Sequence, residues 1–463
     1  MKTRTEHDSL GTKQVPQAAY YGVETQRAIE NYPVSGLKFH SAFIWATAGI
    51  KKAAAEANFA LKHLNSRVAK AIIRASEDVM SGKLDDQFVV DVFQSGAGVS
   101  QHMNTNEVIA NRALEILGHR KGDYSEVHSH DHVNMGQSTN DVIPAALRIA
   151  TIKLLHEFYP VVQKLRDGLA QKAHQFHRVV KSGRTHMQDA APITLGQEFS
   201  GYTRVVEKAL KRVKATEHNL RELGIGGSAV GTGLNTTLAY RRKLIQNLNR
   251  ITHFNLRSGS NLFELMQSTA DFSSVSGELK TFALSLIQIA NDLRLLSSGP
   301  KTGLNEIELP ARQPGSSIMP GKVNPVMPEM LTMVCFQVVG NDLAISMATG
   351  AGQLELNIMI PTVIHNLLTS IEILKNGIDV FTRFCVTGIK ANTRRLAEYA
   401  EASYGIAAAL NPYLGYSHAA RVVEESVRTG KTLREVVRER NLLPERKLRH
   451  VLSPERLTQP KSR

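Results

Sequence analysis

Residues 315–329, with the sequence GSSIMPGKVNPVMPE, contain the side chains of this chain that are best suited to chemistry. Two hydroxyls, Ser316 and Ser317, stand a few residues before Lys322 and Asn324. A lysine ammonium and an amide with two donors suit a bound carboxylate. A serine can act as a base or nucleophile when its surroundings lower its pKa. An isolated Ser-Ser pair is more typical of a surface turn, but the whole string favours a functional loop.

Two further polar segments carry candidate binding residues. The QSTND segment, 137–141, places Ser138, Thr139 and Asn140 just before a long apolar stripe. These residue types predict a helix N-cap, and a helix N-terminus also attracts an anion, so both interpretations can hold. The GRTHMQDA segment, 183–190, supplies Thr185 and His186. One histidine among 17 is by itself more often structural than catalytic.

Long amphipathic stripes must position these segments. Apolar residues recur at intervals of three and four, which predicts helices. The stripes cover residues 142–179, 202–223, 275–296, a stretch from about 328, and 364–384. Pro160 predicts a kink or a break in the first of them. Strand-like alternation is nearly absent, so we predict an all-α fold in which long helices pack as a bundle.

Composition narrows the class of protein. The chain has 463 residues, 42% of them hydrophobic, and a net charge of +14. Only two cysteines occur, which excludes a disulfide framework and a cysteine-based zinc site. We find no secretory signal and no run near the roughly 20 apolar residues of a membrane span, so we expect a cytoplasmic protein without a membrane partner. The basic stretch 434–463 is interpreted as a solvated, mostly helical surface, and no nucleic-acid partner is expected.

We predict three domains from the positions of the stripes and the polar segments. They are an N-terminal domain at 1–138, a central domain of long helices at 139–394, and a small helical domain at 395–463.

The motifs together resemble the aspartase/fumarase superfamily. GSSIMPGKVNP closely matches the signature loop of that family. The opening DSLGTKQVPQAAYYGVETQRAIENYPVSG, the QSTND and GRTHMQDA segments, GTGLNT, NDLRLLSSGP and NPYLGY follow in the family's order. The resemblance therefore covers essentially the whole chain.

The resemblance implies an anti-elimination from a four-carbon dicarboxylate through an aci-carboxylate, with no metal and no pyridoxal cofactor. In it Ser316 is the general base, and His186 pairs with Glu329 and faces the substrate. It assigns substrate binding to Val99, Ser138, Thr139, Asn140, Thr185, Ser317, Lys322 and Asn324. It also implies a homotetramer built on shared long helices, with each active site drawn from three chains.

Two positions depart from the family pattern. Val99 stands where the family usually has a threonine that touches the substrate, and His102 stands where asparagine is usual. Residues 104–107, NTNE, match a family string, but a cap for the helix after them is an equal alternative. Tyr20 to Gly22, Thr139 and PVMPE favour aspartate as substrate, whereas VIHN at 363–366 resembles the fumarase branch.

Three alternatives remain open at this point. The chain could be a class II fumarate hydratase, or a related lyase that acts on a modified succinate. It could also be an inactive structural homologue, although the retained Ser316, Lys322, Asn324, His186 and Glu329 argue against that.

Overall fold

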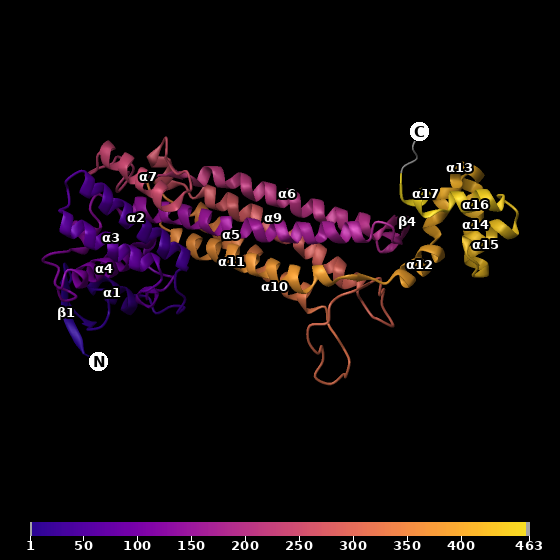
Figure 1. Cartoon of the computed structure of the whole chain (residues 1–463), viewed down its shortest axis with the longest axis horizontal. Helices are drawn as coiled ribbons and strands as arrows, with labels where there is room; N and C mark the ends of the chain where they lie inside the picture. Colours follow the sequence, from indigo (N-terminus) through magenta and orange to yellow (C-terminus); the bar gives the residue numbers. More distant parts are fainter. Residues whose placement is uncertain (1, 460–463) are drawn as a thin grey trace. The chain divides into compact units, whose positions relative to one another are not determined.

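The computed structural model describes residues 2–459, and their fold is predominantly helical, which confirms the all-α prediction (Figure 1). The five longest helices are α5 (Thr139–Gln175), α6 (Leu195–Leu220), α9 (Ala270–Leu296), α10 (Val326–Gly350) and α11 (Ile360–Phe384). Helix α5 continues through Pro160, so the predicted break is absent. Phe158, Val162 and Leu165 are fully buried on either side of the proline, and this packing offsets the lost backbone hydrogen bond.

Contacts divide the chain into two compact units. The first contains residues 1–159, 211–283 and 336–375. The second contains residues 160–210, 284–335 and 376–463. Each of the five longest helices contributes residues to both units. The three-domain division with boundaries near 138 and 394 stays a prediction.

Within the first unit the five long helices form a closed bundle, because polar contacts join each helix to the next. The contacts are Tyr159–Glu217 for α5 with α6, Arg212–Glu278 for α6 with α9, Ser276–Asp342 for α9 with α10, Asn341–Ser370 for α10 with α11, and Lys375–Glu157 for α11 with α5. Apolar side chains fill the space between the helices, as the edge-to-face rings of Phe158 and Phe282 show. The stripes read from the sequence are thus the core faces of this bundle.

The first unit also contains shorter helices, three of which share a second apolar core. They are α1 (Val23–Asn31), α2 (Ser41–Ala60), α3 (Ser66–Met80), α4 (Val99–Ile116), α7 (Leu238–Thr252) and α8 (Leu262–Gln267). Val68, Ile72, Val108 and Leu114 belong to the core that α2, α3 and α4 share. The N-terminal strands β1 (Thr3–Asp8) and β2 (Gly11–Pro16) form an antiparallel hairpin. The short strands β5 (Glu222–Leu223) and β6 (Arg257–Ser258) pair in parallel.

The second unit carries another hairpin and the C-terminal helices. Strand β3 (Val180–Thr185) pairs with β4 (Gln188–Thr194), and β7 (Ile307–Glu308) pairs with β8 (Lys390–Ala391). The C-terminal helices are α12 (Thr393–Ala402), α13 (Asn411–Leu414), α14 (Tyr416–Thr429), α15 (Leu433–Glu439), α16 (Glu445–Val451) and α17 (Pro454–Thr458). Short 3₁₀ and π helices complete the described chain: η1 (Asp85–Gln87), η2 (Gly96–Gly98), the π-helix η3 (Ser129–Val133), η4 (Val386–Gly388) and η5 (Tyr404–Leu410).

The basic C-terminal stretch is a charged helical surface over the described residues. Its arginines pair with nearby carboxylates: Arg434 with Glu401, Arg438 and Arg449 with Glu445, and Arg440 with Glu425. This pairing agrees with the interpretation as a solvated surface. The last residues of the stretch, 460–463, lie outside the described part.

Helix α10 exposes an apolar stripe. Met333, Phe336, Leu343 and Met347 are each at least 60% exposed, and within residues 2–459 no other segment lies within 4 Å of the position that a Cβ on Gly340 would take. Their spacing of three and four residues is that of a helix that packs against another helix. By length and composition α10 could also cross a membrane, but its buried Asn341 and Asp342 pair inside the protein, as in a core helix.

Candidate active site

The residues predicted for the site fall into both units, and each group is described by itself. Val99, Ser138, Thr139 and Asn140 belong to the first unit. The second unit holds Thr185, His186, Ser316, Ser317, Lys322, Asn324 and Glu329.

The QSTND segment begins helix α5, as its residue types predict. The Ser138 hydroxyl accepts from the Asn140 N–H, and the Ser138 N–H donates to Asp141 Oδ1 at 2.9 Å. Asp141 Oδ2 also accepts from the N–H groups of Gly226 (3.0 Å) and Ser228 (3.1 Å). Burial raises the pKa of this carboxyl to about 6, although its N–H donors and Lys51 act in the opposite direction. Asp141 therefore joins the helix start to the glycine-rich segment.

We expect Asp141→Ala to loosen both segments. It leaves backbone donors without an acceptor, each at a cost of about 1–3 kcal/mol. The melting temperature should fall by several degrees, and KM should rise because Ser138, Thr139 and Asn140 lose their support. Thermal unfolding and steady-state kinetics check this. Asp86→Ala, at an exposed position of the same unit, is the matched control and should change neither quantity.

A buried polar chain that the sequence did not reveal lies behind Thr139. The His102 ring is buried, with Nδ1 2.8 Å from Thr139 Oγ1 and Nε2 2.6 Å from Lys51 Nζ. Val99, three residues before His102, begins helix α4 and is 41% exposed. His102 thus contacts Thr139, a predicted binding residue, whereas the side chain of Val99 is partly exposed to solvent.

Thr185 and His186 lie at the tip of the β3–β4 hairpin. Thr185 pairs with Gln188, so His186 and Met187 are the two turn residues. Both have positive φ angles, 52° and 61°, which side-chain-bearing residues rarely adopt. Non-glycine residues in this region store backbone strain, and such strain concentrates at functional sites. Both Thr185 and His186 are exposed in the single chain.

A buried ion-pair cluster holds the base of that hairpin. Glu306, which is completely buried, lies 2.9 Å from Lys181 Nζ and 2.7 Å from Arg184 Nη1. Lys181 also pairs with Glu198 at 2.9 Å. Both cations belong to β3, so the cluster fixes the strand that ends in Thr185. In the sequence, the alternation of Lys181, Gly183 and Thr185 only weakly indicates a strand at this place, and it does not reveal the ion pairs.

The signature loop is closed at its base by Gly315. Its N–H donates to the Lys322 carbonyl at 2.7 Å, and the Asn324 amide donates to the Gly315 carbonyl at 2.8 Å. A Cβ on Gly315 would lie 2.8 Å from the backbone nitrogen of Asn324, so only glycine fits. The loop therefore presents Ser316, Ser317 and Lys322 from a fixed base.

Ser316 has two backbone donors on its hydroxyl oxygen. The N–H groups of Ile318 and Met319 lie 3.2 and 3.0 Å from Oγ. Donors that converge on one oxygen stabilise a negative charge there. A serine that acts as a base needs such stabilisation, because an ordinary hydroxyl is a very weak acid.

His186 and Glu329 do not meet in the single chain. Glu329 lies in the first turn of α10, and no hydrogen bond or ion pair joins it to His186 within residues 2–459. Lys322 is exposed and has no ion-pair partner in the same range. The predicted His186–Glu329 pair stays a prediction.

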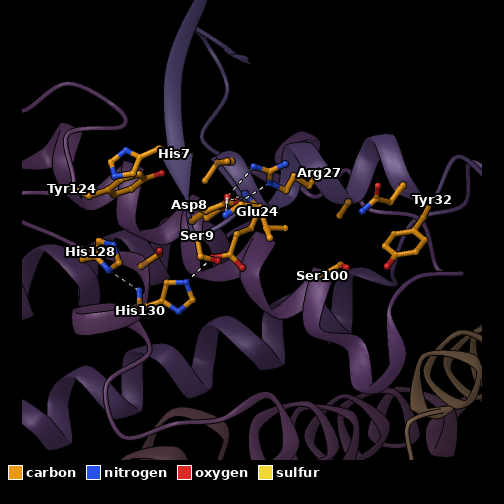
Figure 2. Close-up of a pocket in the computed structure, with 16 residues that line it drawn as sticks. His7, Asp8, Ser9, Glu24, Arg27, Tyr32, Ser100, Tyr124, His128 and His130 are labelled. Carbon is orange, nitrogen blue, oxygen red and sulfur yellow. Dashed lines mark hydrogen bonds and ion pairs between the residues drawn. The ribbon is translucent and has the colours of Figure 1, made fainter. Parts of the chain in front are cut away.

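A cleft in the first unit is lined by none of the predicted site residues. It measures about 730 Å³ and lies between the N-terminal hairpin, α1 and the π-helix (Figure 2). Its charges are paired: Arg27 binds both Asp8 oxygens, and His130 Nε2 lies 2.5 Å from Glu24 Oε1. Ser100, which lines the cleft, directly follows the predicted binding residue Val99 in the sequence.

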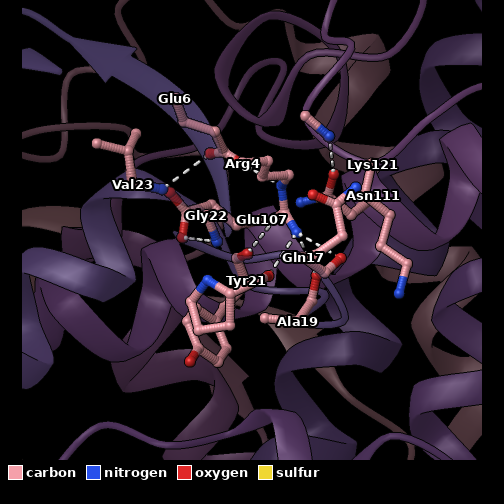
Figure 3. Close-up of polar contacts among 12 residues, drawn as sticks. Arg4, Glu6, Gln17, Ala19, Tyr21, Gly22, Val23, Glu107, Asn111 and Lys121 are labelled. Carbon is pink, nitrogen blue, oxygen red and sulfur yellow. Dashed lines mark hydrogen bonds and ion pairs between the residues drawn. The ribbon is translucent and has the colours of Figure 1, made fainter. Parts of the chain in front are cut away.

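A cap at residues 104–107, which the sequence offered as an equal alternative to the family string, is absent because these residues lie inside α4. Glu107 caps a different helix: its carboxylate accepts from the N–H groups of Gly22, Glu24 and Thr25 at the start of α1 (Figure 3). Burial raises the pKa of Glu107 to about 7. Local spacing could not reveal this contact, because some 80 residues separate its partners in the chain.

The residues above supply hydroxyl, amide and ammonium donors from loops on a helical scaffold. Such a set is typical of an enzyme that binds a small anion. Two family models match: one described as lyase covers residues 11–340, and one described as the fumarase C C-terminus covers residues 406–459. The chain belongs to the lyase family, within the aspartase/fumarase superfamily.

Relatives match over nearly their full length. An aspartate ammonia-lyase of Bacillus subtilis strain 168 is 48% identical, over 99% of this chain and 96% of the relative. One of Escherichia coli K12 is 45% identical over the same shares. A Brucella melitensis structure described as fumarate lyase:delta crystallin, bound to cobalt, is 45% identical, with a TM-score of 0.96 over 99% and 100% of the two chains. A class II fumarase of Schistosoma mansoni is 37% identical, with a TM-score of 0.93 over 98% of each.

Proposed function

We propose that this chain is an aspartate ammonia-lyase, which converts L-aspartate reversibly to fumarate and ammonia. The observation that carries the proposal is the 44–48% identity to enzymes of that name across 99% of the chain. Retention of the whole GSSIMPGKVNP loop supports it, because an inactive homologue has no need for these side chains.

In this proposal Ser316 acts as the base. Its alkoxide takes a proton from C3 of aspartate, and the electron pair forms an aci-carboxylate on the neighbouring carboxyl group. The C2–N bond then breaks, ammonia leaves, and the double bond of fumarate forms. The N–H groups of Ile318 and Met319 stabilise the alkoxide before the proton is transferred. His186, paired with Glu329, faces the substrate and adds positive charge or moves a proton.

The remaining predicted residues bind the two carboxylates. Lys322 and Asn324 suit one of them, because a free ammonium and an amide supply several donors. Ser317 and Thr185 add hydroxyls to that group. Ser138, Thr139 and Asn140 lie at the N-terminus of α5, whose first N–H groups and dipole favour a second anion. Val99 borders this second group without offering a hydrogen bond.

The proposal includes a homotetramer in the cytoplasm, with each active site drawn from three chains. Two observations support it. The α10 stripe leaves large apolar side chains exposed in the single chain. The exposed Thr185, His186, Ser317 and Lys322 also lack the enclosure that a catalytic site needs.

A substrate panel tests the proposed function. The purified chain is offered L-aspartate, L-malate, and N- or 3-substituted aspartates, and fumarate or its analogue is followed by ultraviolet absorbance. We expect turnover of aspartate well above that of every other compound. Preferred turnover of malate would favour the fumarate hydratase alternative, and turnover of none would favour an inactive homologue.

Lys322→Ala should damage binding and turnover together. The ammonium contacts a carboxylate in both the ground state and the aci-carboxylate, so its loss removes a charged hydrogen bond from each. We expect KM to rise and kcat to fall, each by roughly 10- to 100-fold. Lys301→Ala, at an exposed lysine of the same unit, is the control. An unchanged KM would remove Lys322 from the binding group.

A further inference from the structure

Lys51 is a buried cation that the proposed mechanism does not use. Its side chain is inaccessible to solvent, in the middle of α2. Nζ donates to Asn134 Oδ1 at 2.9 Å and lies 2.6 Å from His102 Nε2. The amide nitrogen of Asn134 is turned toward the Gln137 carbonyl, at 3.3 Å, so its oxygen faces Lys51. A buried charge is costly unless it is paired, and such groups are retained where they do something.

The three side chains Lys51, His102 and Thr139 form one continuous chain of hydrogen bonds, here called the relay. An ammonium can only donate, so a charged Lys51 makes His102 Nε2 an acceptor. A neutral imidazole has one N–H, which must then be on Nδ1 and donate to Thr139 Oγ1. The hydroxyl oxygen is thereby occupied, and its hydrogen is free to donate to a ligand.

We propose that charged Lys51, acting through His102, makes Thr139 a hydrogen-bond donor to a carboxylate of the substrate, and that loss of the Lys51 proton reverses the relay. A neutral amine accepts from Nε2–H. Nδ1 then accepts from the Thr139 hydroxyl and withdraws its hydrogen from the ligand. Lys51 and His102 are positioning residues in this account, and the inference rests on the proposed binding role of Thr139.

The surroundings make Lys51 easier to deprotonate than an ordinary lysine. Burial lowers the pKa of Lys51 well below its ordinary value, and the nearby Asp141 carboxylate of α5 opposes this. Burial also lowers the pKa of His102, to which Lys51 and His130 of the π-helix contribute, so the ring stays neutral. From α7, Tyr240 lies near enough to Asp141 that this carboxylate helps to raise its pKa, and its hydroxyl donates to the Met135 carbonyl at 3.5 Å. The relay therefore contains one group that loses charge as pH rises.

Succinate affinity is the direct measurement, because succinate has two carboxylates and no amino group to titrate. Its dissociation constant is measured by calorimetry across neutral and alkaline pH, together with aspartate kinetics. For the wild-type chain we expect binding to weaken by roughly 10- to 100-fold as pH rises, the usual value of a hydrogen bond to a charged group. Thr139→Val should bind weakly at every pH and show no such dependence, while Thr139→Ser should restore it.

A double-mutant cycle tests whether His102 acts only through Thr139. His102→Leu should weaken succinate binding in the wild-type background and have no further effect in Thr139→Val. Lys52→Met, next to Lys51 but paired with Glu77 near the surface, is the control and should preserve the pH dependence. Thermal melting verifies that each variant is folded.

Several results would overturn the relay. These are a pH-independent succinate affinity in the wild type, a dependence that persists in Thr139→Val, or additive effects in the cycle. Each of them leaves the proposed function intact if aspartate is still converted to fumarate. Failure to bind any dicarboxylate would instead overturn the proposed function and, with it, the relay.

Discussion

Ser316→Ala should reduce kcat for aspartate by roughly 10²- to 10⁴-fold, which is the usual contribution of a positioned base. KM should change little, because Lys322, Asn324 and the hydroxyls at the start of α5 still hold the carboxylates. The Ile318 and Met319 N–H groups would lose their acceptor, but they lie on an exposed loop where water replaces it. Steady-state kinetics and succinate binding on the same preparation separate the two effects.

Ser317→Ala is the matched comparison for this variant. It removes the neighbouring hydroxyl, on which no backbone donor converges within residues 2–459, and it should raise KM more than it lowers kcat. If Ser317→Ala lost more turnover than Ser316→Ala, the assignment of the base would be reversed.

Leu343→Glu should dissociate the oligomer and abolish activity. The leucine lies in the middle of the exposed α10 stripe, and a carboxylate buried there without a partner costs several kcal/mol in each copy. Light scattering should show a smaller particle, and aspartate turnover should disappear with it, because the proposed homotetramer combines Thr185, His186 and Lys322 with residues of neighbouring chains.

Val427→Glu controls for the added charge. Val427 is 60% exposed on α14, outside the stripe, and the substitution should alter neither size nor activity. A Leu343→Glu variant that is monomeric and fully active would contradict shared active sites. Mixed preparations of Ser316→Ala and His186→Ala should regain part of the activity if one site combines residues of different chains.

The long helices could be predicted because each has an apolar stripe that local spacing reveals. The stripes at 275–296 and 364–384 end at the last residues of α9 and α11, and these helices begin five and four residues before the stripes. Pro160 misled the prediction, because buried residues on both sides hold α5 together. Short strands such as β5 and β7 could not be predicted, since two residues carry no alternation.

The candidate site was predictable where chemistry is concentrated in one segment, and not where it depends on distant partners. Ser316 and Lys322 stand out by their neighbours in sequence. From the sequence, His102 could be recognised only as a departure from the family pattern. Its proposed role depends on its contact with Lys51, which is 51 residues away in the chain. In the sequence, this contact could have been suspected from Lys51 itself, because it is a charged residue within an alanine-rich segment that forms a buried helix. The contact of Asp141 with Gly226 and Ser228 likewise depends on the fold of the glycine-rich segment.

Val99 is the position at which substrate preference could differ from that of relatives. Valine has nearly the shape of threonine, but it lacks the hydroxyl donor that the family usually has at this position. Val99 is 41% exposed in the single chain and lies outside the buried core, so Val99→Thr should disturb the core little.

The most direct test of the central claim runs the reaction in reverse in heavy water. The chain is incubated with fumarate and ammonium in D₂O, and the product is analysed by proton NMR. If Ser316 delivers the proton in an anti-addition of ammonia, the product is aspartate with one deuterium at C3, in a single diastereomer, and Ser316→Ala forms almost none. Malate as the product, or aspartate with deuterium on both faces of C3, would contradict the account.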